Sequence, residues 1–279
     1  MLRRYITPLF LFYLCSALYN QAYAKEKYTC PRIISQSPYI TEMLTYLEIE
    51  QCIVGVSRYS KRDLPHSGGI LDPDAEAIAL LSPDLLITSD WINPRSLKAI
   101  TPAGVKVLQL KSFNKMDQLE NNMMAVIKAT HWKKSIPKVI AFKKAWREKI
   151  KKIRGNNKKV LLLSSCSGMP YSFGSNTRLY DLFSQAGFKV VESKKKIRHI
   201  RPGNEIEDIT ALLDRYQPDL LFIFEQRQNK QCQMITSNVP VKILNFDGSL
   251  FLNPETKILR GLDMLISQKH HWIKESPYE

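Results

Sequence analysis

The stretch SIPKVIAFKKAWREKIKKIR, residues 135–154, determines how the rest of the chain is organised. Its apolar side chains recur at steps of three and four residues, which is the spacing of one apolar face of an α-helix. That face consists of Val139, Phe142, Trp146, Ile150 and Ile153.

The ends of this helix also have sequence signals. Ser135 is a candidate cap, and Pro137 suits the first turn, where its missing N–H is not needed. Gly155, Asn156 and Asn157 tolerate a left-handed backbone, so they favour an end at Arg154. A helix over residues 137–154 would span roughly 27 Å.

Two similar series of expected strands and helices lie on either side of this helix, over residues 32–110 and 159–246. Both contain PDLL ahead of an apolar strand, at Pro83 and Pro218, which are 218 − 83 = 135 residues apart. Because strands and helices alternate, we expect an α/β chain of two similar lobes with parallel sheets covered by helices. A chance recurrence of PDLL is the alternative.

The N-terminus differs from the rest of the chain. Arg3 and Arg4 precede an apolar run over residues 6–18, and Ala22-Tyr23-Ala24 has the pattern of a cleavage site. The run is too short to span a bilayer comfortably. We therefore predict that residues 1–24 are a secretory signal removed after Ala24, and that the protein is exported to the periplasm. A retained anchor is the alternative.

Four cysteines follow the predicted signal, and export makes disulfides permissible. Cys30 and Cys52 each lead into one of two expected neighbouring strands, so we favour a Cys30–Cys52 bridge. Cys166 and Cys232 would then pair in the second lobe. Buried free thiols are the alternative for either pair.

The chain is basic, with a formal net charge of +15. Removal of Arg3 and Arg4 with the signal leaves +15 − 2 = +13. The lysines are spread over helices and loops, which favours a solvated basic surface or an anionic ligand. We expect no nucleic-acid partner, because an exported protein rarely meets one.

The segment RIISQSPYITEMLTYLEIEQCIVGVSRYS, residues 32–60, resembles the opening of periplasmic substrate-binding proteins that serve ABC importers of cobalamin and iron–siderophores. The resemblance continues in GGILDPDAEAIALLSPDLLITSD (68–90) and more loosely in YSFGSNTRLYDLFSQAGF (171–188) and LNPETKILRGLDML (252–265). It implies two Rossmann-like lobes with mainly parallel central sheets, joined by a single long α-helix. We expect an N-terminal lobe over 25–112, linker helices over 113–157 and a C-terminal lobe over 158–279.

The resemblance also implies a function. The protein would capture a metal chelate (cobalamin, a ferric siderophore or haem) in the cleft between its lobes, and deliver it as a monomer to an ABC permease and its ATPase. The long helix would allow the cleft to close only slightly.

Loops at the strand ends supply the candidate ligand contacts, since ligands of open α/β sheets bind there. Aromatic faces suit a flat or bulky chelate, and Tyr59 matches a ligand-contacting family position. Arg201 stands near a point where cobalamin binders place an aromatic residue before proline, which favours an anionic siderophore or haem. The candidates are Tyr39, Tyr59, Trp91, Tyr171, Phe173, Arg201 and Phe251. Loop packing, or a solvated basic loop for Arg201, is the alternative.

Two acidic residues are candidates for docking to the permease. In the family, one Glu on each lobe pairs with permease arginines. Glu76 matches the first of these, and Glu207 is the candidate for the second. A carboxylate at a helix N-terminus, stabilised by the helix dipole, is the alternative for both.

Catalytic and metal-binding motifs are absent from the sequence. Neither a GxGxxG nor a GxxxxGK[ST] string follows a strand, and there is no GxSxG elbow. The histidines are scattered rather than clustered: they are His66, His131, His199, His270 and His271. We expect no cofactor and no enzymatic activity. The alternatives are an exported transferase-like enzyme with a cleft active site and direct binding of zinc or manganese.

Overall fold

The computed structural model describes residues 30–111, 113–164, 169–225 and 240–273. The predicted signal over residues 1–24 and the predicted Cys166–Cys232 pair lie outside these residues. Cys30 and Cys52 are each disulfide-bonded. None of the helices within the described ranges is both long and apolar enough to cross a membrane.

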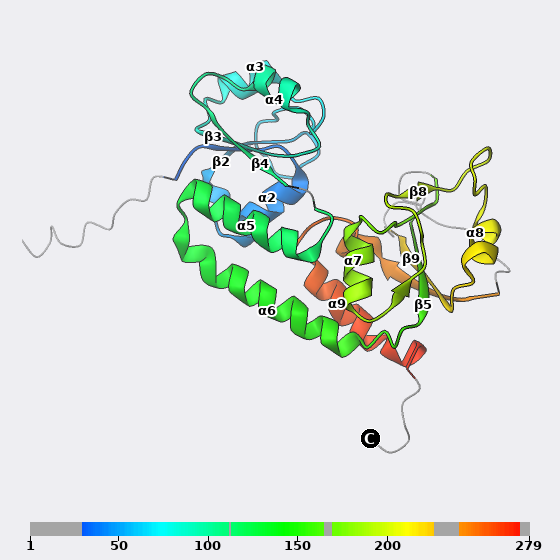
Figure 1. Cartoon of the computed structure of the whole chain (residues 1–279). Coiled ribbons are helices and arrows are strands. Elements are labelled where there is room, and N and C mark those ends of the chain that lie inside the picture. Colours follow the sequence, from blue (N-terminus) through cyan, green and yellow to red (C-terminus); the bar gives the residue numbers. More distant parts are fainter. Residues whose placement is uncertain (1–29, 112, 165–168, 226–239, 274–279) are drawn as a thin grey trace, which may run out of the picture. The chain divides into compact units, whose positions relative to one another are not determined.

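The first lobe is built on a four-stranded parallel sheet with the order β2-β1-β3-β4 (Figure 1). Its strands are β1 (Ile33–Ser35), β2 (Ile53–Val56), β3 (Leu85–Ser89) and β4 (Lys106–Leu110). Its helices are α2 (Pro38–Tyr46), α3 (Ala75–Leu80) and α4 (Pro94–Ile100). Ile34 and Leu86 of the sheet pack with Ile78 of α3 and Leu97 of α4 in one core cluster. The sequence did not predict α4.

The second lobe is built on a mixed sheet. Its parallel strands are β5 (Lys159–Ser164), β7 (Lys189–Val190), β9 (Leu220–Glu225) and β10 (Lys242–Asp247). The short strands β6 (Tyr171–Ser172) and β8 (Arg198–His199) extend it in antiparallel pairing, which the sequence did not predict. Its helices are α7 (Arg178–Gln185), α8 (Ile209–Tyr216) and α9 (Ile258–Ser267).

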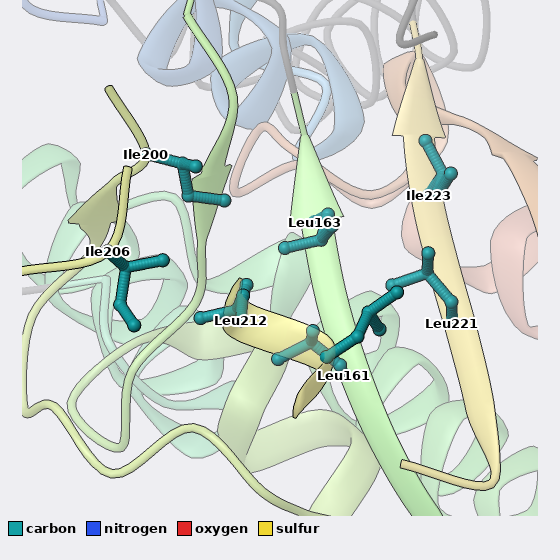
Figure 2. Packing of buried hydrophobic residues seen from close by; sticks show 8 residues of the cluster. Leu161, Leu163, Ile200, Ile206, Leu212, Leu221 and Ile223 are labelled. Carbon is teal, nitrogen blue, oxygen red and sulfur yellow. The ribbon is translucent and has the colours of Figure 1, made fainter. Parts of the chain in front are cut away.

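Helix α8 packs on one face of this sheet (Figure 2). Leu212 of α8 belongs to one buried cluster with Leu161 and Leu163 of β5 and with Leu221 and Ile223 of β9. The strand residues are two apart, so they point to the same face of the sheet. A continuous apolar run places apolar side chains on both faces of the sheet, which is typical of a sheet that is covered by helices.

The two lobes repeat one topology, which confirms the two-lobe prediction. The parallel strands of the second lobe have the order β7-β5-β9-β10, which matches β2-β1-β3-β4 of the first. The aspartate of each PDLL string has the same role: Asp84 accepts a hydrogen bond from the backbone N–H of Arg32 at 2.7 Å. Asp219 accepts one from the N–H of Lys159 at 2.8 Å. Each carboxylate thus ties the third parallel strand of its lobe to the beginning of the first.

The long helix α6 (Ile136–Ile153) follows α5 (Met116–Thr130), and the five residues of its predicted apolar face are all buried. It packs against α5 and against α9 of the second lobe (Figure 1). Near its beginning, Tyr46 of α2 donates a hydrogen bond to the carbonyl of Lys138 at 3.1 Å. At its end, the indole N–H of Trp272 donates to the carbonyl of Ile153 at 3.2 Å. The helix is therefore fixed to both lobes.

Two details of helix ends differ from the sequence prediction. The Ser135 side chain does not cap α6, because its hydroxyl donates to the carbonyl of Leu47 instead. The sequence pattern also predicts a helix from Glu205 to Tyr216, but α8 begins at Ile209. The Asp208 side chain accepts a hydrogen bond from the N–H of Ala211 at 2.8 Å and caps the helix there.

Candidate ligand-binding cleft

The carboxyl ends of all four strands of the first lobe deliver an aromatic residue to one cavity of about 470 Å³. Tyr39 follows β1 at the start of α2, Tyr59 follows β2, Trp91 follows β3 and Phe113 follows β4. Parallel strands end at the same edge of a sheet, which is where open α/β sheets bind ligands. The cavity is within the usual size range of small-molecule sites.

Two of these aromatic residues are packed and two are exposed. Tyr39 is buried between Trp91 and Phe113, with ring centroids 5.6 and 4.9 Å away in edge-to-face arrangements. Burial raises the pKa of the Tyr39 hydroxyl. Tyr59 is 61% exposed and Trp91 55% exposed. These two side chains therefore present large apolar faces to the cavity, and Trp91 also packs edge-to-face against the buried Tyr39.

The double glycine at residues 68 and 69 shapes the loop that carries Tyr59. Gly68 has a φ of +86°, and a side-chain carbon on it would lie 2.4 Å from the backbone nitrogen of Asp74. A side-chain carbon on Gly69 would lie 2.1 Å from the Asp72 carboxylate and 3.3 Å from the Tyr59 ring. Arg58 pairs with Asp72 at 2.8 Å and closes the loop. The two glycines thus allow the backbone at residues 68–69 to pack directly against the Tyr59 ring.

The second lobe supplies the other wall of the cavity. Phe173 lies directly after β6, and Arg178 begins α7. The Arg178 guanidinium Nη2 donates to the carbonyls of Phe251 at 2.6 Å and Asn253 at 2.8 Å, which holds the loop after β10 in place. The residues that this lobe contributes are Phe173, Thr177, Arg178, Leu179, Ile197, Leu252, Asn253 and Pro254.

Of the seven predicted ligand contacts, Tyr39, Tyr59, Trp91 and Phe173 line this cavity. Phe251 does not, because it is fully buried among the aromatic rings of the second lobe. Gly261 of α9 leaves the room for it, since a side-chain carbon there would lie 2.8 Å from the Phe251 ring. Tyr171 also lies outside the lining, against Phe173 and His199.

Arg201 lines a second, smaller cavity of about 250 Å³. Ile197 lines both cavities, so the two are neighbours. Lys194, Arg198 and His199 share the smaller cavity with Arg201, which gives it a basic character. The basic cluster predicted from the sequence is therefore assembled, but beside the aromatic cavity rather than inside it.

Arg198 is committed to a buried ion pair. Its guanidinium lies 2.9–3.2 Å from the Glu192 carboxylate in three hydrogen bonds, and it also contacts Glu205 at 3.0 Å and the Tyr216 hydroxyl at 2.9 Å. Burial by itself would raise the pKa of Glu192, but the hydrogen bonds from Arg198, Ser172, Lys194 and Tyr216 lower it to about 2. Arg198 therefore stabilises the fold through this buried ion pair.

A third cavity of about 930 Å³ adjoins the aromatic one, since Pro38, Tyr59 and Asn253 line both. It is lined mainly by charged and polar residues. In this cavity Lys257 forms ion pairs with Glu255 at 2.9 Å and with Glu42 of α2, in the first lobe, at 3.7 Å. The aromatic cavity therefore has a polar, ion-paired neighbour on the side of Tyr59.

The two predicted docking carboxylates lie on the surface. Glu76 is exposed in the first turn of α3, with no ion pair among the described residues. Glu207 is exposed in the loop before α8, where it accepts a hydrogen bond from the N–H of Gly203 at 3.1 Å. In the parts of the chain that the structure describes, no three His, Cys, Asp or Glu residues form a group that could hold a metal ion.

Sequence reasoning missed Phe113 and Arg178. Phe113 could have been found, because it follows a predicted strand just as Trp91 does. Arg178 gave no such signal, since an arginine in the first turn of a helix is usually exposed.

The fold places this chain among proteins with two such lobes and a long connecting helix. A family model described as "Periplasmic binding protein" matches residues 33–239. The chain therefore belongs to the periplasmic binding protein family, whose members are binding proteins rather than enzymes and work with ABC permeases. A search of curated proteins finds no match.

Solved structures of the family share the fold. The periplasmic vitamin B12 binding protein BtuF of Vibrio cholerae is 16% identical with a TM-score of 0.68, covering 88% of this chain and 99% of its own. A periplasmic haem-binding protein from Pseudomonas aeruginosa is 21% identical with a TM-score of 0.65, covering 88% and 94%. The siderophore-binding protein BauB, bound to acinetobactin and ferric iron, is 15% identical with a TM-score of 0.66, covering 88% and 94%. At such identities the likeness establishes the fold and not the ligand.

Proposed function

We propose that this protein is the periplasmic solute-binding component of an ABC importer, and that it carries a metal chelate rather than catalysing a reaction. The chelate is a cobalamin, a ferric siderophore or haem. It binds between the lobes and is then delivered to the permease and its ATPase. Export through the signal over residues 1–24 and action as a monomer belong to the same proposal.

One observation supports this proposal above the others: two large, exposed aromatic side chains face a cavity lined from both lobes. Tyr59 and Trp91 are exposed and line the cavity together with the packed rings of Tyr39 and Phe113. A preformed apolar surface binds a flat or bulky ligand at little cost in ordering entropy. The known ligands of the structurally similar proteins, which are vitamin B12, haem and a ferric siderophore, have this shape.

The test is a spectroscopic titration of the purified protein with four coloured chelates: haemin, cyanocobalamin, a ferric tris-catecholate and a ferric trihydroxamate. We expect saturable binding of at least one. Absence of binding to all four would refute the proposal.

The position of the site has its own control. Tyr59→Ala and Trp91→Ala should each weaken binding about tenfold or more, because both remove aromatic contact area at the centre of the site. Ile140 on α6 has the same exposed fraction as Tyr59 and lies outside the cavity lining, so Ile140→Ala should leave the affinity unchanged. Equal affinities for all three variants would show that the ligand binds elsewhere.

A further inference from the structure

The two lobes repeat one topology, but the amino ends of their strands differ in charge. In the first lobe the charged residues at this edge sum to 2 − 3 = −1: Arg32, Glu48, Glu50, Asp84 and Lys106. In the second lobe they sum to 4 − 1 = +3: Lys158, Lys159, Lys189, Asp219 and Lys242. Because the parallel strands have the same order in both lobes, the positive charge of the second edge is not a requirement of the fold.

The end of α6 adds to this positive charge. Residues 149–159 read KIKKIRGNNKK, with six lysines and arginines and no acid. Lys149 is paired with Asp263. The other five, together with Lys189, are exposed, form no ion pair among the described residues and line none of the three cavities. These six residues form the basic edge: Lys151, Lys152, Arg154, Lys158, Lys159 and Lys189.

Backbone hydrogen bonds hold the two parts of the basic edge together. The N–H groups of Gly155 and Asn157, in the loop after α6, donate to carbonyls of the turn before β7, both at 2.8 Å. The N–H of Lys189 donates to the carbonyl of Lys158 at 2.9 Å. The end of α6 and the start of β7 therefore lie side by side, and the backbone positions of the cations are fixed relative to one another.

Local stabilisation does not account for the whole basic edge. The three cations at the end of α6 are stabilised by the helix dipole, but a β-sheet has only a small net dipole for the other three. Lys159 and Lys189 are partners in the register of β5 and β7, so their like charges lie on the same face and repel each other. The acid at this edge, Asp219, forms no ion pair within the described ranges, and its carboxylate accepts the backbone N–H of Lys159. Contact with an anionic surface would relieve the repulsion.

We propose that the basic edge binds the surface of a membrane leaflet that contains anionic phospholipid. Its cations come from a helix end, a loop and two strands and line none of the cavities, so they suit an extended anionic surface better than one small anion. Phosphate headgroups attract such clusters, and each lysine raises the partition coefficient about fivefold. The inference goes beyond the proposed function, because it concerns where the protein is held and not what it carries. The choice of lipid over nucleic acid uses the proposed export.

Helix α7 has the aromatic cavity at one end and the basic edge at the other. Arg178, at its start, lines the cavity. The turn after its end accepts the hydrogen bonds from the loop after α6. The eight residues of the helix span roughly 12 Å. A molecule bound to lipid through the basic edge therefore keeps its cavity away from the lipid and accessible to a ligand.

The test is co-sedimentation of the purified protein with phosphatidylcholine vesicles that contain or lack phosphatidylglycerol. We expect much tighter binding to the vesicles with phosphatidylglycerol. This binding should be lost as the salt concentration rises from about 0.1 M to about 1 M, because the Debye length falls from about 10 Å to about 3 Å. Equal binding to both kinds of vesicle, or binding to neither, would overturn the proposal.

Two further ligands exclude other anions. Sodium phosphate should displace the protein from the vesicles no better than sodium chloride of equal ionic strength. Better displacement by phosphate would assign the basic edge to a small anion and overturn the proposal. Tighter binding to a random-sequence DNA duplex than to the vesicles would overturn the choice of lipid.

A matched pair of triple variants locates the binding surface. The edge variant should bind the vesicles about a hundredfold more weakly, from about fivefold for each lysine; it combines Lys158→Gln, Lys159→Gln and Lys189→Gln. The control variant changes three exposed lysines outside the basic edge that form no ion pair among the described residues: Lys98→Gln, Lys106→Gln and Lys128→Gln. Both variants remove three positive charges, so the control should retain binding within about threefold. Equal weakening by the two variants would show that net charge alone decides binding, and would overturn the assignment to the basic edge.

Discussion

Removal of the Arg198 side chain tests the buried ion pair of the second lobe most directly. Arg198 is 4% exposed and Glu192 is 2% exposed, and three hydrogen bonds of 2.9–3.2 Å join them. Arg198→Met preserves much of the volume but leaves the Glu192 carboxylate buried without its cation. Breaking a buried pair in this way costs about 3–5 kcal/mol, a large part of the stability of an ordinary domain.

Arg215 supplies a matched control, because it pairs with Glu205, the same carboxylate that Arg198 also contacts. Its side chain is 42% exposed, so Arg215→Met should cost less than about 1 kcal/mol. Urea unfolding at neutral pH, followed by far-UV circular dichroism, measures both variants.

A double variant separates the causes. If the cost of Arg198→Met comes from the uncompensated charge of Glu192, then Glu192→Gln in the Arg198→Met background should restore part of the lost stability. The reasoning is refuted if Arg198→Met is no more destabilising than Arg215→Met. It is also refuted if the double variant is less stable than Arg198→Met alone.

Three further predictions concern other parts of the chain. The pKa of Glu192 lies at about 2 instead of 4.5, so the stability that its ionised form contributes is complete above pH 4.5 and is lost as pH falls towards 2. In acid unfolding curves, the free energy of unfolding of Glu192→Gln should therefore decline less steeply with falling pH than that of the unchanged protein. Gly155→Ala should lower the free energy of unfolding by about 2–3 kcal/mol, because its new carbon would lie 2.5 Å from a backbone nitrogen. Gly104 has a φ of +82° but open space around it, so Gly104→Ala should cost only about 1 kcal/mol; thermal unfolding compares the two variants. Glu76→Arg should abolish uptake of the chelate by cells without changing the affinity of the protein for the chelate. The control Glu148→Arg on α6 should leave uptake intact. Normal uptake with Glu76→Arg would exclude this carboxylate from docking to the permease.

The sequence predicted the parts of the fold whose signal is periodic and local. The apolar face of α6 is buried at all five predicted positions. The apolar runs over residues 53–56 and 159–164 predict strands, and β2 and β5 have these bounds. The antiparallel strands β6 and β8 were missed because each has only two residues, too few for any period to be seen. The start of α8 was misplaced because an acidic residue, Asp208, supplied the cap inside an expected helix.

The site was predictable to the extent that topology fixes it. Residues at the ends of consecutive parallel strands had to converge, and Tyr59 and Trp91 do. The direction of a side chain after the strand end was not predictable. Phe251 turns into the core because Gly261, ten residues further on, leaves space for its ring. Arg178 and Arg201 look alike in the sequence, and only burial and hydrogen bonding distinguish them.

The attachment of α6 to both lobes bears on how the protein unfolds. Each lobe has its own sheet, yet the buried face of the helix completes packing on both sides, and its first and last turns accept hydrogen bonds from Tyr46 and Trp272. Loss of either lobe would therefore expose part of the same helix to water. The described residues of both lobes also belong to one compact unit by their contacts. We expect a single cooperative transition that probes in either lobe report together, rather than two independent steps.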